Sequence, residues 1–265
     1  MLLFRREIFA NLKSLSIWSG GMVFLILAGM GKYEAGAQGG PGSMEELFSG
    51  MPESLKNIFG IGVFDLSRAI EYYGILFIYI ALMLSLHAVF IGSGIIAKEE
   101  RDKTADFLLV KPISRSRVLA EKLAAALVIQ MILWSITFAT SYALLSHYSQ
   151  GDGFVEELLS LMGAGLFLQI LFLFFGAFWA GILTKPKRAA AVSSAILLLM
   201  FVIKIVSDLS ESVQPVGYLS FFRYFDAKDI LIRGYSPIHL LFPGICCCGF
   251  LFFAFRGYRR RDIHS

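Results

Sequence analysis

Charged side chains are scarce in this chain of 265 residues: Asp, Glu, Lys and Arg make up 17% of it, whereas 57% of the residues are hydrophobic. A soluble globular domain has about 25% charged and about 45–50% apolar residues. The apolar excess, with a mean hydropathy of +0.69, has no soluble core to fill. The composition therefore indicates an integral membrane protein.

Cysteine is also rare, and its three copies, Cys246, Cys247 and Cys248, are adjacent within an apolar run. Neighbouring cysteines have neither the spacing of a disulfide framework nor that of a zinc site. We interpret them as small apolar residues of a membrane span.

Catalytic and nucleotide-binding motifs are missing. The chain has no Gly-x-x-x-x-Gly-Lys-Ser/Thr loop, so it cannot bind and hydrolyse ATP in that way, and it has no His-Glu-x-x-His or Gly-x-Ser-x-Gly sequence. The histidines are scattered, at 87, 147, 239 and 264. An enzymatic activity of its own is therefore not expected, and a membrane-embedded enzyme is kept only as an alternative.

Six apolar segments are long enough, or nearly so, to cross a hydrocarbon core of roughly 30 Å. They lie at about 16–31, 72–97, 123–146, 158–183, 189–207 and 238–255. No cleavage site of a signal peptide is convincing, so we expect the first span to be retained. The predicted fold is an all-α integral membrane protein with one transmembrane domain over 1–265.

The segment 2–15 places apolar residues such as Leu3, Ile8 and Leu12 on one helical face and cations such as Arg5 and Arg6 on the other. A helix of this kind lies in the headgroup plane, so we predict an N-terminal interfacial helix. The alternative is a simple extension of the first span.

Lys and Arg residues set the orientation, because cytoplasmic loops carry more of them. With a cytoplasmic N-terminus, 17 of the 24 Lys and Arg residues fall inside. Both termini are therefore predicted to be cytoplasmic. The same sorting explains the net charge of +4 without a nucleic-acid partner.

The stretch 98–122 is the most densely charged interruption of the apolar pattern. The residues that define it are Glu99, Glu100, Arg101, Thr104, Asp106, Phe107, Leu108, Leu109, Pro112 and Arg115. Thr104 can cap a short helix with an apolar Phe107-Leu108 side, Pro112 ends that helix, and Ser114 can cap the helix that enters the third span. This pattern predicts a short, rigid apolar knob, and the alternative is a charged surface loop that only follows the topology bias.

This stretch resembles the first cytoplasmic loop of type-2 ABC transporter permeases. The family pattern is a Glu-Glu pair, Thr-x-Glu-x-Leu-Leu, Pro-Ile/Val-Ser-Arg and a Lys that opens the third span. The chain matches it except at Asp106, where Glu is usual, and at Lys103, where Gly often precedes the Thr. The six-span layout, the interfacial helix and the Met51-Pro52-Glu53 segment resemble the family as well.

The resemblance implies that the knob is a coupling helix between spans two and three, which docks into a cleft on an ATPase subunit. It implies two copies of that subunit, which bind ATP and Mg, a second permease subunit (the same chain or a related one), and no cofactor on this chain. Export from a bacterial or archaeal plasma membrane follows from it, and the aromatic-rich spans favour an amphipathic or hydrophobic cargo. The alternative is an ATPase-independent secondary transporter or a membrane anchor of an extracytoplasmic assembly.

Polar residues inside the spans are costly and therefore candidates for function. His87 could lie on a substrate pathway or be a buried histidine bonded to a neighbouring helix. Lys204 could bind substrate or extend to the interface with Asp208, one turn away. Gln130 and Gln169 are expected to form hydrogen bonds between helices.

Two further patterns concern packing. The small residues of Gly92-Ser93-Gly94 and Gly163-Ala164-Gly165 predict close helix contacts. The phenylalanines of the fourth span are expected to face lipid or a partner; they are Phe167, Phe172, Phe174, Phe175 and Phe178.

Overall fold

The computed structural model describes residues 2–38, 68–101, 114–149, 153–183, 186–209 and 211–260. Regular structure within these ranges is entirely helical. The six long helices are α1 (Leu2–Gln38), α4 (Ala69–Arg101), α6 (Arg115–Tyr148), α7 (Val155–Ile182), α8 (Pro186–Leu209) and α11 (Pro237–Arg260). Each contains an apolar stretch long enough to cross a membrane, which confirms the predicted fold class.

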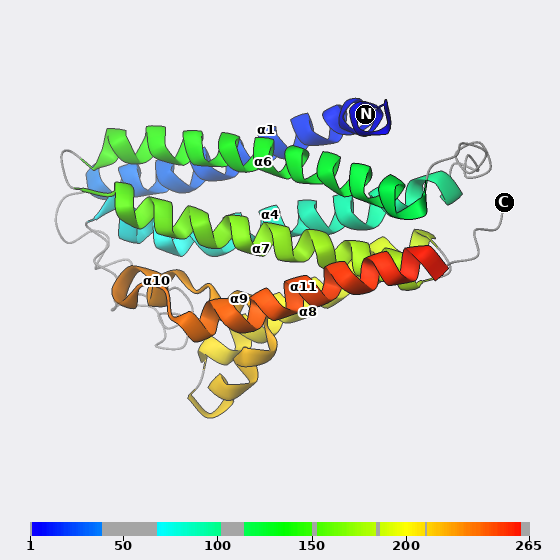
Figure 1. Ribbon diagram of the computed structural model, residues 1–265. Coiled ribbons are helices and arrows are strands. Elements are labelled where there is room, and N and C mark those ends of the chain that lie inside the picture. The colour runs from blue at the N-terminus through cyan, green and yellow to red at the C-terminus, as the bar shows by residue number, and fades with distance from the viewer. Residues whose placement is uncertain are drawn as a thin grey trace.

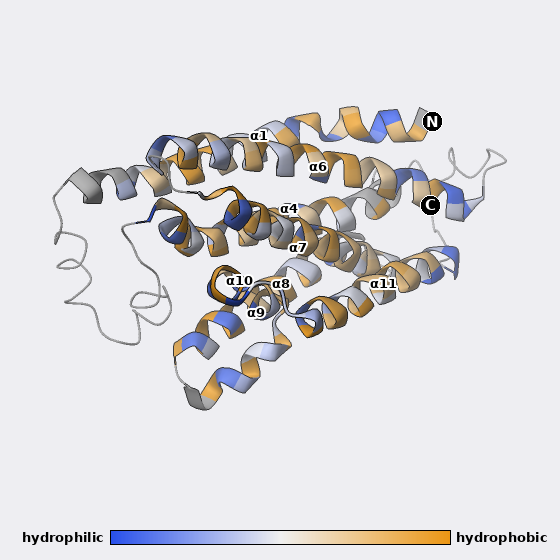
Figure 2. Ribbon diagram, turned by 60° about the vertical axis from the view of Figure 1, so that its left-hand side comes forward, coloured by the Kyte–Doolittle hydropathy of each residue, from blue (hydrophilic) through white to orange (hydrophobic). Residues whose placement is uncertain are grey.

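The long helices run side by side, and the start of α1 and the end of α11 lie at the same end of the bundle (Figure 1). We call this the terminal end. Three short helices follow α8: the 3-10 helix η1 (Glu211–Leu219), α9 (Phe221–Tyr224) and α10 (Ala227–Arg233). Figure 2 shows hydrophobic residues along the lengths of the long helices and hydrophilic ones mainly towards their ends, as membrane-spanning helices require.

Helix α1 contains both the predicted interfacial segment 2–15 and the predicted first span 16–31 without a break. No proline interrupts residues 2–38, so nothing in this stretch forces the helix to end. Its first turns are seen nearly end-on in Figure 1, whereas the rest runs lengthwise, so the helix changes direction near its start. The location of 2–15 in the headgroup plane stays a prediction.

Helices α4 and α7 form the tightest contact of the bundle. A Cβ atom added to Gly92 would lie 2.1 Å from the carbonyl oxygen of Leu173, and one added to Gly176 would lie 2.6 Å from that of Val89. Only glycine permits two helix backbones to approach so closely. The predicted close contact at Gly92 is confirmed, whereas Gly94 faces open space.

A second backbone contact joins α7 to α11, where a Cβ on Gly257 would lie 2.7 Å from the carbonyl oxygen of Gly181. Helix α8 packs on α4, while α1 packs mainly on α6. The bundle therefore consists of two helix groups: a larger group of α4, α7, α8 and α11, and a smaller pair of α1 and α6.

The phenylalanines of α7 differ from the expectation. Phe172 and Phe175 are buried: the Phe172 ring packs 5.4 Å from that of Phe222 on α9, and the Phe175 ring packs 5.2 Å from that of Phe250 on α11. The expectation that these two face lipid is wrong. Because α7 is apolar on every side, its sequence has no stripe that marks the face covered by α9 and α11.

Candidate functional site

The predicted docking stretch 98–122 is bounded by two long helices. Glu99, Glu100 and Arg101 form the last turn of α4, and Arg115 is the first residue of α6. Thr104, Asp106, Phe107, Leu108, Leu109 and Pro112 lie outside the described residues. Helix α4 therefore extends beyond the predicted span 72–97, and α6 begins before the predicted span 123–146.

The start of α6 is capped as expected. Ser114 has an extended backbone, and its Oγ accepts a hydrogen bond from the backbone N–H of Arg117 at 3.4 Å. This satisfies one of the free N–H groups of the first turn. The docking stretch therefore ends at a defined helix terminus, and Lys122 lies two turns inside α6, where it is buried.

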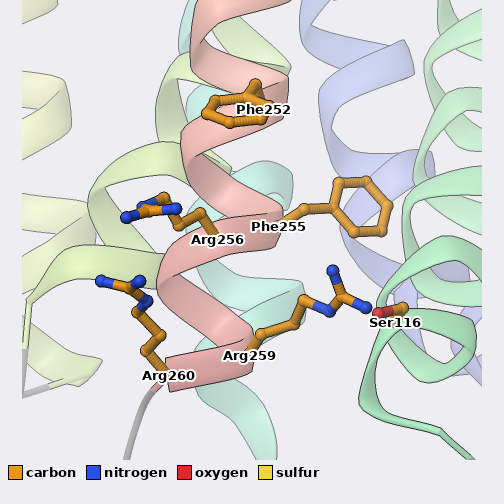
Figure 3. Close-up of a pocket in the computed structure, with 6 residues that line it drawn as sticks. All are labelled: Ser116, Phe252, Phe255, Arg256, Arg259 and Arg260. Atoms are coloured by element: carbon orange, nitrogen blue, oxygen red, sulfur yellow. The ribbon is translucent and has the colours of Figure 1, made fainter.

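The same helix start is joined to the end of α11. Arg115 donates a hydrogen bond from Nη1 to the backbone carbonyl of Arg259 at 3.5 Å. Beside this contact lies an open cavity of about 640 Å³, lined by Ser116, Phe252, Phe255, Arg256, Arg259 and Arg260. Arg259 and Phe255 extend towards Ser116 on α6, whereas Arg256 and Arg260 project from the other side of α11 (Figure 3).

Inside the bundle, His87 belongs to a polar cluster that joins three helices. Its Nδ1 lies 3.0 Å from Oε1 of Gln130 on α6, and Nε2 of Gln169 on α7 donates to the same oxygen at 2.5 Å. All three side chains are fully buried. The ring of Trp18 on α1 packs 5.4 Å from the imidazole, so the cluster lies at the boundary between the two helix groups.

The hydrogen bonds assign the tautomer of His87. Nε2 of Gln169 also donates to the backbone carbonyl of Gln130 at 3.3 Å, which fixes the amide group of Gln169. Gln130 must then present its oxygen to Gln169, and therefore to His87 as well, so Nδ1 of His87 carries the hydrogen. Nε2 of His87 is left as a buried acceptor with no partner among the described residues.

Lys204 belongs to a separate charged cluster at the end of α8. Its ammonium group lies 2.6 Å from the carboxylate of Asp208 and 2.9 Å from that of Asp226, and only 6% of the residue is exposed. Arg223 adds contacts to Asp226 at 3.7 Å and to Asp229 at 3.3 Å. The expected pair with Asp208 is present, but sequence reasoning missed Asp226, which no local spacing connects to Lys204.

Asp226 also caps α10, because its carboxylate accepts a hydrogen bond from the backbone N–H of Lys228 at 2.9 Å. Burial raises the pKa of Asp226, but the positive charge of Lys204 and the hydrogen bonds outweigh it, so the pKa lies below its ordinary value of 3.8. The carboxylate is ionised at neutral pH and anchors the short helices to α8.

The two candidate pathway residues, His87 and Lys204, thus lie in different clusters, each bonded to neighbouring helices. Among the described residues, no group of three His, Cys, Asp or Glu side chains is placed to hold a metal ion. Both clusters connect neighbouring helices.

The described part of the chain is thus a bundle with six helices long and apolar enough to cross a membrane, joined by buried polar contacts. Residues 1–236 match a family described as "ABC-2 family transporter protein". No curated protein matches the chain significantly. The match covers most of the chain, so the protein belongs to the ABC-2 transporter family and is a membrane permease subunit of an ABC transporter.

Proposed function

We propose that this permease exports an amphipathic or hydrophobic cargo and is energised by a separate ATPase subunit that docks on the stretch 98–122. The observation that carries the proposal is the position of this stretch. It connects α4 of the larger helix group to α6 of the smaller pair. A force applied there acts on both groups at once.

The packing supports coupling by movement of whole helices. The backbone contacts at Gly92 and Gly176 prevent α4 from sliding independently of α7, and α6 is tied to α1 by its main packing surface. Closure of the ATPase subunits therefore shifts α1 and α6 relative to the larger group. The cluster of His87, Gln130 and Gln169 spans the boundary that has to move.

ABC-2 permeases generally work with an ATPase subunit, and this sequence has no phosphate-binding loop of its own. The proposed assembly contains two permeases and two ATPase subunits that bind ATP and Mg, in a bacterial or archaeal plasma membrane. The excess of Lys and Arg at the predicted inner segments supports an orientation with both termini in the cytoplasm.

An apolar cargo is supported by the large hydrophobic side chains on the outside of the bundle. Phe24 on α1 is 73% exposed and Ile238 on α11 is 74% exposed. A path between two permeases lined by such side chains would favour a cargo with apolar surface.

The test replaces an apolar residue of the docking stretch by a charge. Phe107→Asp and Leu108→Asp are each expected to abolish copurification with the ATPase subunit and ATP-driven transport in proteoliposomes, while membrane insertion is retained. Val155→Asp is the matched control, because Val155 is exposed at the first turn of α7, where an acidic residue is favourable.

Unchanged transport in both variants would overturn the docking proposal. Transport that needs an ion gradient but no ATP would support the secondary-transporter alternative instead. A chain that copurifies with an extracytoplasmic assembly and moves no cargo would support the anchor alternative.

A further inference from the structure

Three arginines of α11 line the cavity at the terminal end, and a fourth, Arg115 of α6, is bonded to the backbone of one of them. Arg115 donates a hydrogen bond to the backbone carbonyl of Arg259, so the start of α6 lies against the end of α11. Arg256, Arg259 and Arg260 line the cavity. None of these last three pairs with a carboxylate in the described part of the chain. Like charges at close range repel, so an anion bound here would stabilise the arrangement.

The cavity also has an apolar part. Phe252 is 61% exposed and Phe255 is partly buried. Phe252 lies one turn of α11 before Arg256, and Phe255 lies one turn before Arg259. Helix α11 changes at this point from apolar to basic residues, which is the depth at which a span leaves the hydrocarbon core. The cavity is therefore apolar on its membrane side and basic on its outer side.

We propose that this cavity binds an anionic phospholipid. Its phosphate lies between the Arg259 guanidinium and the Ser116 hydroxyl, which Figure 3 shows on facing helices. An acyl chain runs along Phe252 and Phe255, and Arg256 and Arg260 attract a further negative charge of the headgroup. Basic pockets between membrane helices bind anionic headgroups in this way.

A lipid fits the cavity better than an acidic protein surface does. The two phenyl rings need an apolar partner, which a carboxylate-bearing loop does not supply. The volume of about 640 Å³ accommodates a headgroup with the start of its chains. The bound lipid would bridge α6 and α11 beside the docking stretch, and so make the energised cycle sensitive to the lipid composition of that leaflet.

The full-length permease is reconstituted in nanodiscs of phosphatidylcholine, with and without phosphatidylglycerol. Phosphatidylglycerol is expected to raise the Tm of the wild type and to remain bound in native mass spectrometry. Arg259→Gln should weaken apparent binding of phosphatidylglycerol about fivefold, because each arginine near an anionic surface contributes about a factor of five. R256Q/R259Q/R260Q should therefore weaken it by about two orders of magnitude. Arg188→Gln is the control, because Arg188 is exposed at the start of α8.

Three results would overturn the proposal. The first is a triple variant that retains phosphatidylglycerol as the wild type does. The second is an equal Tm rise with millimolar inorganic phosphate, which would make the site one for free phosphate. The third is a triple variant with normal lipid binding that loses the ATPase subunit, which would assign the arginines to the partner. Rescue of binding by Arg259→Lys would support a role for the positive charge and exclude misfolding as the cause.

Discussion

Nδ1 of His87 on α4 donates a hydrogen bond to Oε1 of Gln130 on α6 across 3.0 Å, in a fully buried environment. This bond joins the two helix groups that the proposed mechanism moves against one another. Unpaired polar groups are costly in a membrane interior, so the bond favours one relative position of the groups.

Gln130→Met is expected to destabilise the permease. The substitution conserves the side-chain volume but removes the acceptor of the His87 N–H, and the Gln169 amide keeps only its bond to the backbone carbonyl of residue 130. Each orphaned buried donor costs about 1–3 kcal/mol. Thermal unfolding in nanodiscs should show a lower Tm, with Ser135→Ala as the control because the Ser135 hydroxyl is exposed and bonds only within α6. Equal values for both variants would contradict a structural role of the cluster.

Gly92→Ala is expected to force α4 and α7 apart. Its Cβ would lie 2.1 Å from the Leu173 carbonyl oxygen, and such overpacking costs about 1–3 kcal/mol. Gly94→Ala, two residues further along the same helix, meets nothing within 4 Å and should stabilise the helix by up to about 1 kcal/mol. Opposite shifts of Tm in the two variants are the expected result, and the same shift in both would refute the close contact.

Lys204→Met is expected to loosen the short helices after α8. It leaves the largely buried carboxylates of Asp208 and Asp226 without their shared cation, and breaking a buried pair costs about 3–5 kcal/mol. Hydrogen exchange should accelerate in residues 211–233. Lys32→Met, at an exposed position of α1, should leave exchange there unchanged; acceleration in both variants would point to a general loss of charge rather than to the cluster.

The contribution of Asp226 to the stability of the folded protein should be lost at low pH. The pKa of Asp226 is lowered in the folded protein, so its contribution is complete above the ordinary value of 3.8 and is lost as the pH falls through the lowered pKa. Lys204, Arg223, Asp208 and Asp229 surround the same charge.

Asp226→Asn separates charge from capping, because asparagine caps helices as well as aspartate does. The variant should be less stable at pH 7 and lose less stability than the wild type between pH 5 and the acid limit of the measurement. Parallel acid unfolding curves would show that another group carries the pH dependence.

Hydropathy predicted the six spans because each span must bury its own backbone in lipid, so the signal is contiguous in the sequence. The cap at Ser114 was also predictable, because a capping side chain bonds to the backbone of residues that directly follow it in the sequence. Lys204 and Asp208 are four residues apart and hence one turn apart on a helix.

Contacts between distant segments could not be predicted in this way. Arg115 and Arg259 are 144 residues apart, and nothing local pairs them. Gln130 and Gln169 were expected to form hydrogen bonds between helices, and the structure confirms this. That His87 donates to the same Gln130 oxygen depends on how α4, α6 and α7 are rotated about their axes. The buried face of α7 around Phe172 is hidden by its uniform hydrophobicity.

The contact between the first turn of α6 and the last turn of α11 also provides a site for distance measurements during the transport cycle. Spin labels at Arg117 and Arg260, both exposed, would report the separation of a helix that leaves the docking stretch from one that is packed on α7. Cys246, Cys247 and Cys248 are free thiols and would first be replaced by alanine. A distance that differs between the ATP-bound and ATP-free complex would show that the two helix groups move relative to one another.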